Sequence, residues 1–146
     1  SSKELFVKGK KQNKSYYYFD NGSIYQIVNF LNDRRDNLTR EFDRDGKLIT
    51  VIEYRKNIIT KKEKINRIDD RGYKQGVWRT YFDNDRIWKE DNYLNNQLHG
   101  YSREYNIRGQ LLKSYRYFNG VLMPNTDDKE IKAIVKKSYH DNGNIK

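Results

Sequence analysis

Residues 18–33, YFDNGSIYQIVNFLND, carry the pattern that decides the fold. Relative to Gly22, an aromatic residue stands four positions before, an aliphatic residue two after, an aromatic residue eight after and a second turn residue eleven after. An Asn-Gly pair between alternating apolar residues is the strongest local signal of a β-hairpin, because a type I′ turn requires positive φ at both central residues. The stretch therefore predicts two antiparallel strands joined by a type I′ turn at Asn21-Gly22.

The same pattern recurs along the chain, with 24 residues between the first two copies. In the five successive copies, the residue at the turn position is Gly22, Gly46, Asp85, Gly109 and Gly143. The aromatic residue four positions earlier is Tyr18, Phe42, Tyr81, Tyr105 or Tyr139. Extra residues separate the copies at about 58–72 and 121–130. A pattern that recurs with this regularity identifies a repeat protein built from hairpins.

The repeat predicts an all-β fold: a single array over residues 1–146, in which successive hairpins form one continuous, elongated and twisted antiparallel meander. The apolar offsets −4, +2, +6 and +8 share parity, so they are predicted to lie on one face of the sheet. Residues 58–72 are predicted to form longer strands and an exposed loop. The segment 127–137 also carries a helix-like apolar pattern, so a short helix there is the alternative to a strand.

The composition is that of a folded, basic and aromatic-rich domain. The chain has 146 residues, among them 13 Tyr, 6 Phe and 2 Trp, which argue against disorder. Its 30 Lys and Arg against 20 Asp and Glu give a net charge of +10, which predicts acidic partners. The absence of cysteine excludes disulfides, thiol nucleophiles and Cys-based zinc sites. No apolar run is long enough for a transmembrane helix.

Two stretches resemble a known repeat family. Residues 75–81, QGVWRTY, and residues 96–111, which begin NQLHGY, are similar to the variant MORN repeat (MORN_2 type), and the chain resembles the YwqK-like antitoxins. The first two copies depart from the pattern, because Asn13 and Asn37 stand where the third and fourth copies have glycine. The resemblance implies a bacterial, non-enzymatic β-meander that binds another protein, such as a toxin.

No candidate catalytic, metal or cofactor site emerges from the sequence, and we expect no enzyme. His99 and His140 lie in different copies without a second histidine or a glutamate at ligand spacing, so they are interpreted as surface residues beside turns. Asp43–Gly46 resembles the start of a calcium loop, but the twelfth position is Tyr54 instead of glutamate. Asp69–Gly72 is predicted to be a turn.

The candidate binding residues lie around the turns at Asp85 and Gly109. Six positions before the turn residue, a basic residue recurs in four of five copies, including Arg79 and Arg103. Beside tyrosines, such arginines can bind carboxylates or phosphates. The alternative is that they pair with glutamates of neighbouring strands, namely Glu41, Glu53, Glu90 or Glu104. Aromatic residues of the other face form an exposed interface or, alternatively, part of a second core layer. The predicted partner-binding residues are Trp78, Arg79, Tyr81, Trp88, Arg103 and Tyr105.

The sequence therefore predicts a non-catalytic, protein-binding repeat module of antitoxin or immunity type, whose basic aromatic sheet face binds an acidic protein such as a toxin. Two alternatives stay open: a polyanion binder, for anionic membrane lipid or nucleic acid, and a surface scaffold without a specific ligand. The lysines are scattered through every repeat, which disfavours a dedicated nucleic-acid groove. An antitoxin would work in the bacterial cytoplasm, whereas a leader removed before Ser1 would place the chain in the cell envelope or outside the cell.

Overall fold

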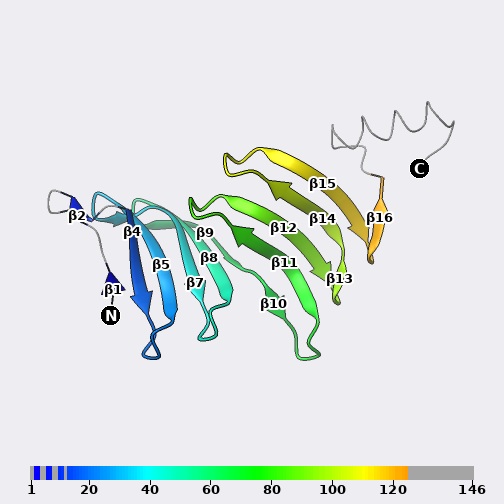
Figure 1. Cartoon of the computed structure of the whole chain (residues 1–146), viewed down its shortest axis with the longest axis horizontal. Helices are drawn as coiled ribbons and strands as arrows, with labels where there is room; N and C mark the ends of the chain where they lie inside the picture. Colours follow the sequence, from blue (N-terminus) through cyan, green and yellow to red (C-terminus); the bar gives the residue numbers. More distant parts are fainter. Residues whose placement is uncertain (1, 4–5, 8–9, 12, 125–146) are drawn as a thin grey trace. The chain divides into compact units, whose positions relative to one another are not determined.

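The computed structural model describes residues 2–3, 6–7, 10–11 and 13–124. The regular secondary structure of these residues consists of β-strands alone (Figure 1). The predicted all-β fold of antiparallel hairpins is therefore confirmed. The segment 127–137 and the copy around Tyr139 and Gly143 lie outside the described residues, as does most of the segment 121–130. The chain divides into two compact units, Ser1–Ile65 and Asn66–Lys146, here called unit 1 and unit 2.

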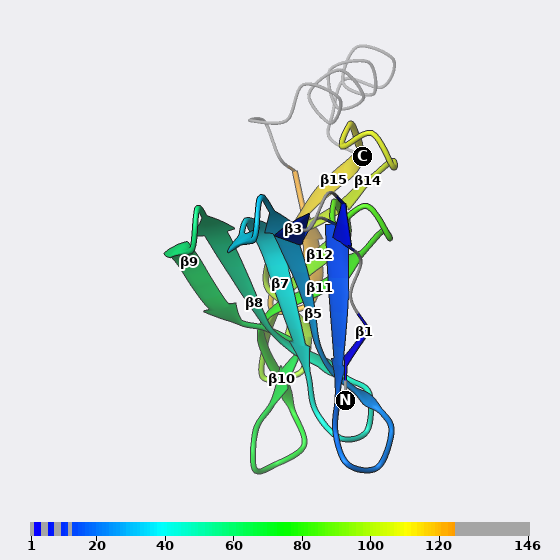
Figure 2. The same cartoon turned by 90° about the vertical axis from the view of Figure 1, so that its left-hand side faces the viewer.

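Unit 1 contains a seven-stranded antiparallel sheet and a separate two-stranded one. Its strands are β1 (Ser2–Lys3), β2 (Phe6–Val7), β3 (Lys10–Lys11), β4 (Asn13–Tyr18), β5 (Ile24–Leu31), β6 (Arg34–Arg35), β7 (Asn37–Phe42), β8 (Leu48–Arg55) and β9 (Ile58–Lys64). The larger sheet runs β1-β4-β5-β7-β8-β9, with β6 also paired to β5, and β2 pairs β3. Figure 2 shows β5, β7, β8 and β9 following one another across this sheet, as a meander requires.

Unit 2 contains a second seven-stranded sheet. Its strands are β10 (Arg67–Ile68), β11 (Lys74–Tyr81), β12 (Ile87–Leu94), β13 (Gln97–Leu98), β14 (Gly100–Tyr105), β15 (Leu111–Phe118) and β16 (Val121–Met123). They run β10-β11-β12-β14-β15-β16, with β13 also paired to β12. Ile24, which starts β5, and Ile87, which starts β12, are 63 positions apart, and the strands that follow begin at the same offset. Each unit is thus built on the same pair of hairpins.

The prediction of one continuous sheet is wrong, because the two seven-stranded sheets are separate. The change occurs within the segment 58–72, where β9 ends one sheet and β10 begins the next. Ile65 N donates to Ile49 O of unit 1 at 3.0 Å, whereas Asn66 N donates to Val77 O of unit 2 at 2.9 Å. Asn66 adopts a left-handed φ of 56°, which redirects the chain between these bonds. Consecutive amides therefore serve different sheets.

Two turn types recur along the chain: they alternate in unit 1, whereas in unit 2 two wide turns, at Gly72 and Asp85, follow each other. At Gly22, Phe19 N donates to Ser23 O (2.8 Å), Gly22 N donates to Phe19 O (3.1 Å), and the glycine φ is 87° while Asn21 keeps a negative φ. This is a type I turn closed by a left-handed residue, so the predicted type I′ turn at Asn21-Gly22 is wrong. The Asn21 side chain accepts a hydrogen bond from Ser23 N (3.0 Å), which stabilises the wider turn. The same backbone bonds recur at the wide turns of Gly46, Gly72, Asp85 and Gly109. The second turn type is the type I′ turn, which has positive φ at both central residues, and it is found at Asn32-Asp33, Lys56-Asn57, Asn95-Asn96 and Asn119-Gly120.

A β-bulge follows the wide turn in each described hairpin of the main repeat and changes which residues share a face. In the first hairpin Tyr18 faces Ile24 and Tyr17 faces Gln26, so Tyr25 is an extra residue. The equivalent bulged residues are Ile49, Trp88 and Leu112. Because the bulge uses one residue, offsets +6 and +8 lie on the face opposite to −4 and +2. The prediction that all four offsets share a face is therefore wrong.

The buried apolar side chains of the described residues all belong to unit 1. They are Ile27, Val28, Leu38, Val51, Ile52 and Ile65. Neighbouring residues of a strand point to opposite faces, so the pairs Ile27-Val28 and Val51-Ile52 show that both faces of the sheet are covered there. In residues 66–124 only Asn66 and Ser114 are buried. The sheet of unit 2 therefore keeps its aromatic side chains half-buried or exposed.

Candidate interaction surface

Three charged side chains form a row across unit 2. Glu90 of β12 faces Arg79 of β11 on one side and Arg103 of β14 on the other. Arg79 Nε donates to Glu90 Oε2 at 2.5 Å, and Arg79 Nη1 donates to the Tyr81 hydroxyl at 3.1 Å. Only 9% of the Arg79 side chain is exposed. Its guanidinium is therefore engaged within the sheet and offers little charge to a partner.

The residues around this row fix its backbone and its second arginine. Asn66 Oδ1 accepts a hydrogen bond from Arg79 N (2.9 Å) and Asn66 Nδ2 donates to Arg79 O (3.4 Å), so the side-chain amide takes the place of a neighbouring strand. The Arg103 guanidinium lies 4.0 Å from the centre of the Tyr101 ring, and its Nε donates to Ser114 Oγ at 3.3 Å. For Arg79, the structure matches the alternative in which the arginine pairs with a glutamate of the next strand.

Trp78 precedes Arg79 in β11 and lies on the opposite face of the sheet. The Tyr93 ring meets it edge-on at 6.0 Å, and the Lys74 ammonium lies 4.5 Å from the Trp78 ring and 5.0 Å from the Tyr93 ring. Aromatic rings attract a cation placed over them. Burial, with a further contribution from the Asp91 carboxylate, raises the pKa of Tyr93. A lysine of the protein itself thus occupies this aromatic pair.

Three of the four bulged residues, Tyr25, Trp88 and Leu112, expose their apolar side chains, whereas Ile49 is half-buried. Trp88 is 41% exposed and stacks on Phe82 with ring centres 5.5 Å apart. In unit 1 the equivalent Tyr25, also 41% exposed, meets Phe19 edge-on at 5.1 Å. Because the neighbouring ring fixes each side chain, the bulge presents a rigid aromatic group to solvent.

In unit 2 such side chains collect beside two neighbouring turns and form what we call the bulge patch. It consists of Trp88, Ile107, Leu111 and Leu112, which are between 41% and 56% exposed. The β11–β12 and β14–β15 turns lie side by side (Figure 1), joined by a hydrogen bond from Asn84 Nδ2 to Ile107 O at 2.8 Å and by one from the Arg86 guanidinium to Arg108 O. Exposed basic residues adjoin the patch in sequence, namely Arg86, Lys89, Arg108 and Lys113.

The six predicted partner-binding residues therefore fall in three places. Four of them, Arg79, Tyr81, Arg103 and Tyr105, share one face by strand register, whereas Trp78 lies on the other face and Trp88 lies at the bulge. Sequence reasoning missed Ile107, Leu111 and Leu112 as candidates. The signal that could have found the bulge is an apolar or aromatic residue three positions after the turn residue, at Tyr25, Ile49, Trp88 and Leu112.

A turn residue organises the β10–β11 end of unit 2. Asp69 Oδ1 accepts hydrogen bonds from Arg71 N (2.9 Å) and Tyr73 N (3.0 Å), and its Oδ2 accepts from Gln75 Nε2 (2.9 Å). These bonds, that from Gln75 above all, hold the pKa of Asp69 well below its ordinary value of 3.8. The ionised carboxylate thus stabilises the predicted turn at Asp69–Gly72.

The described part of the chain contains no group of three His, Cys, Asp or Glu side chains placed to hold a metal ion. It also contains no helix long and apolar enough to cross a bilayer. His99 lies beside a turn, where its Nδ1 accepts a hydrogen bond from Asn119 N at 3.2 Å and its ring lies 5.0 Å from that of Phe118. These contacts give His99 a structural role, and His140 lies outside the described residues.

The family model of the MORN repeat variant matches the chain at residues 11–32 and 74–95. These stretches contain the β4–β5 hairpin of unit 1 and the β11–β12 hairpin of unit 2. No curated protein matches the chain. Repeats of this family are commonly protein- or membrane-binding modules and are generally non-catalytic. Of the residues discussed above, Trp78, Arg79, Tyr81, Trp88 and Glu90 lie within the second matched stretch.

Proposed function

We propose that the chain is a non-catalytic module that binds another protein through unit 2, with the bulge patch at the centre of the interface. The observation that carries the proposal is the patch itself, whose four apolar side chains are between 41% and 56% exposed. Ile107 lies in the β14–β15 turn and the other three lie at the strand starts that follow the β11–β12 and β14–β15 turns, which are hydrogen-bonded to each other. Contiguous exposed apolar side chains rimmed by charge are typical of protein interaction sites.

The free energy that a partner would gain by covering Trp88 is that of a binding hot spot. A tryptophan side chain buries up to about 250 Å², so the 41% exposure of Trp88 leaves about 100 Å² for a partner to cover. At about 25 cal/mol per Å², covering this area contributes about 2.5 kcal/mol. The stack on Phe82 reduces the entropy cost of ordering the indole on binding.

The charge around the patch supports an acidic partner. Arg86, Lys89, Arg108 and Lys113 adjoin the apolar residues, and the whole chain carries a net charge of +10. A positive rim accelerates encounter with an acidic surface and disfavours basic proteins. In its finer form the proposal is that the partner is an acidic toxin and that the module is its antitoxin or immunity protein. The likeness to antitoxins of the variant MORN type supports this finer form.

The test is a binding measurement on a purified partner. Photo-crosslinking from the Leu112 position in cells identifies candidates, and the best candidate is then purified and titrated against the full chain by calorimetry. Trp88→Ala is expected to weaken binding roughly 30-fold, which corresponds to about 2 kcal/mol. Leu112→Ser is the second variant, and Ile68→Ser is its matched control, because Ile68 is a similarly exposed aliphatic residue of unit 2 at 52%.

Two outcomes contradict the proposal. One is an affinity that Trp88→Ala and Leu112→Ser leave at the level of Ile68→Ser. The other is affinity for every polyanion tested, with a logarithm of the binding constant that falls linearly with the logarithm of salt concentration; this would favour the polyanion binder instead. Affinity for the protein partner that persists at high salt and depends on Trp88 supports an apolar interface.

A further inference from the structure

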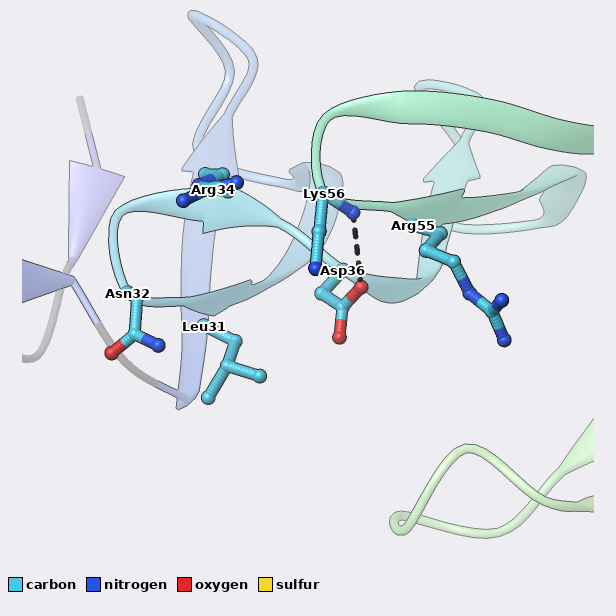
Figure 3. Close-up of a pocket in the computed structure, with 6 residues that line it drawn as sticks. All are labelled: Leu31, Asn32, Arg34, Asp36, Arg55 and Lys56. Carbon is cyan, nitrogen blue, oxygen red and sulfur yellow. Dashed lines mark hydrogen bonds between the residues drawn. The ribbon is translucent and has the colours of Figure 1, made fainter.

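A cavity of about 470 Å³ lies in unit 1 between two type I′ turns. It is lined by Leu31, Asn32, Arg34, Asp36, Arg55 and Lys56 (Figure 3). Figure 3 shows the Lys56 and Asp36 side chains at the centre of this group, with Leu31 and Asn32 on one side and Arg55 on the other. The volume is within the range of small-molecule sites.

The frame of the cavity is held by hydrogen bonds between the two turns. Asn57 N donates to Arg35 O (2.8 Å), and Arg35 N donates to Asn57 Oδ1 (2.7 Å). Lys56 N donates to Asp36 Oδ1 at 3.2 Å, the bond drawn in Figure 3. The backbone of the two turns and the Asp36 carboxylate are therefore held in place before any ligand arrives, which reduces the cost of binding.

The charges around the cavity do not balance. Within the described ranges, the side chains of Arg34, Arg55 and Lys56 form no ion pair, and Asp36 is the one carboxylate among the lining residues. Three cations and one carboxylate leave an excess of two positive charges around one hollow. Like charges that line one hollow repel each other, and an anion bound among them relieves this repulsion, so a dianion is the ligand that this arrangement favours.

The repeat itself provides an internal comparison. Unit 2 contains the same pair of turns 63 positions later, where Asn119 N donates to His99 Nδ1 at 3.2 Å as Lys56 N does to Asp36. The positions equivalent to Arg34, Arg55 and Lys56 are there Gln97, Phe118 and Asn119. The turn geometry therefore does not require a basic residue at any of the three positions. The three cations belong to the cavity of unit 1 and not to the repeat.

We propose that this cavity binds a phosphate monoester with a small apolar substituent. Such a group carries about −1.5 to −2 charge at neutral pH, which matches the excess of positive charge. Arg34 and Arg55 supply planar donor pairs of the kind that bind phosphate oxygens, and Lys56 supplies a third cation. The Leu31 side chain, 51% exposed, provides the apolar wall for the substituent. This site lies in unit 1 and does not depend on the proposed function of unit 2.

Calorimetric titration of the full chain with phenyl phosphate tests the proposal, and benzoate serves as the carboxylate monoanion of similar shape. Arg34→Gln and Lys56→Asn install the residues that unit 2 carries at the equivalent positions, so the turn frame tolerates them. Lys62→Gln is the matched control, because Lys62 is exposed on β9 and does not line the cavity. Far-UV circular dichroism checks that every variant keeps its β-structure.

One phenyl phosphate is expected to bind per chain, about tenfold more tightly than benzoate, because a second negative charge faces the cation group. Each cavity variant is expected to weaken binding about tenfold, the loss of one charge-assisted hydrogen bond, while Lys62→Gln leaves the affinity unchanged. The proposal is overturned if phenyl phosphate does not saturate the chain, if benzoate binds equally well, or if Lys62→Gln weakens binding as much as Arg34→Gln.

Discussion

Replacing Glu90 by glutamine removes the negative charge that lies between Arg79 and Arg103 in the sheet of unit 2. The perturbation removes the carboxylate that accepts the Arg79 Nε hydrogen bond, and the hydrogen bond from Arg79 Nη1 to the Tyr81 hydroxyl is expected to stay. Because the Arg79 side chain is only 9% exposed, water replaces little of what is lost. The variant therefore tests whether this arginine stabilises the fold.

The magnitude follows from the burial of the pair. Removing one partner of a buried ion pair costs about 3–5 kcal/mol. The Glu90 side chain is 19% exposed, so solvent reduces the effect and we expect a loss of about 2 kcal/mol in the free energy of unfolding. Replacing both partners, as Glu90→Leu with Arg79→Met, is expected to recover most of this loss, because no buried charge is then left alone.

Urea unfolding followed by tryptophan fluorescence measures this effect, since both tryptophans, Trp78 and Trp88, lie in unit 2. Glu104→Gln is the matched control in the same sheet, where Glu104 faces Lys89 and Lys113 across the strands. The control is expected to change stability by less than about 0.5 kcal/mol. If Glu90→Gln destabilises no more than Glu104→Gln, the reasoning about the buried pair is refuted.

Three further predictions concern the turns and the core. Gly46→Ala is expected to destabilise unit 1 by about 1–2 kcal/mol in urea unfolding followed by far-UV circular dichroism, because φ is +88° and an added Cβ meets nothing, so that only backbone strain acts; no change would contradict this. Ile52→Ala, at 4% exposure, is expected to cost about 3 kcal/mol in the same assay, and a loss below that of the exposed Ile58→Ala would refute a core role. The lowered pKa of Asp69 predicts that the ionised carboxylate contributes stability in full above its ordinary pKa of 3.8, and that this contribution is lost as the pH falls below 3.8. Asp69→Asn should therefore flatten the acid dependence of the fluorescence of unit 2. An unchanged acid profile in the variant would exclude a stabilising role of the Asp69 carboxylate.

The hairpin repeat was predictable because its determinants are local. Gly22 and Gly46 supply a left-handed backbone at the turn, and the aromatic residue four positions earlier marks the end of the preceding strand. Local signals also suffice for the turn at Asp69–Gly72. Each of these features depends on a few residues that are close together in the chain, so it can be predicted from the local sequence.

The faces were not predictable in the same way, because one bulged residue reverses the alternation that follows it. In the sequence Tyr25 is one more apolar residue after Ile24. Only the strand pairing shows that Tyr25 has no residue opposite it on β4. The division into two sheets likewise depends on Asn66, whose left-handed conformation and bond to Val77 are specific to the folded chain. Alternation alone cannot reveal an insertion of one residue.

The candidate site was predictable in part. The recurring basic position predicts a row of arginines, but it does not tell whether each guanidinium pairs with a glutamate of the same sheet or binds a partner. The answer depends on which residue lies opposite the arginine on the neighbouring strand. Strand pairing places Glu90 beside Arg79 and so removes most of that side chain from the surface. The same strand pairing places a bulge at Trp88, and the Trp88 side chain is exposed to solvent there.

The most direct measurement uses the fluorescence of Trp88 in a complex with the purified partner. In a Trp78→Phe variant Trp88 is the remaining tryptophan of the chain, so its emission reports on the bulge patch alone when the partner contains none. Addition of the partner is expected to shift this emission to shorter wavelength and to protect it from acrylamide, because the exposed indole becomes buried. Saturating partner that leaves both the emission and the quenching unchanged would show that binding takes place elsewhere.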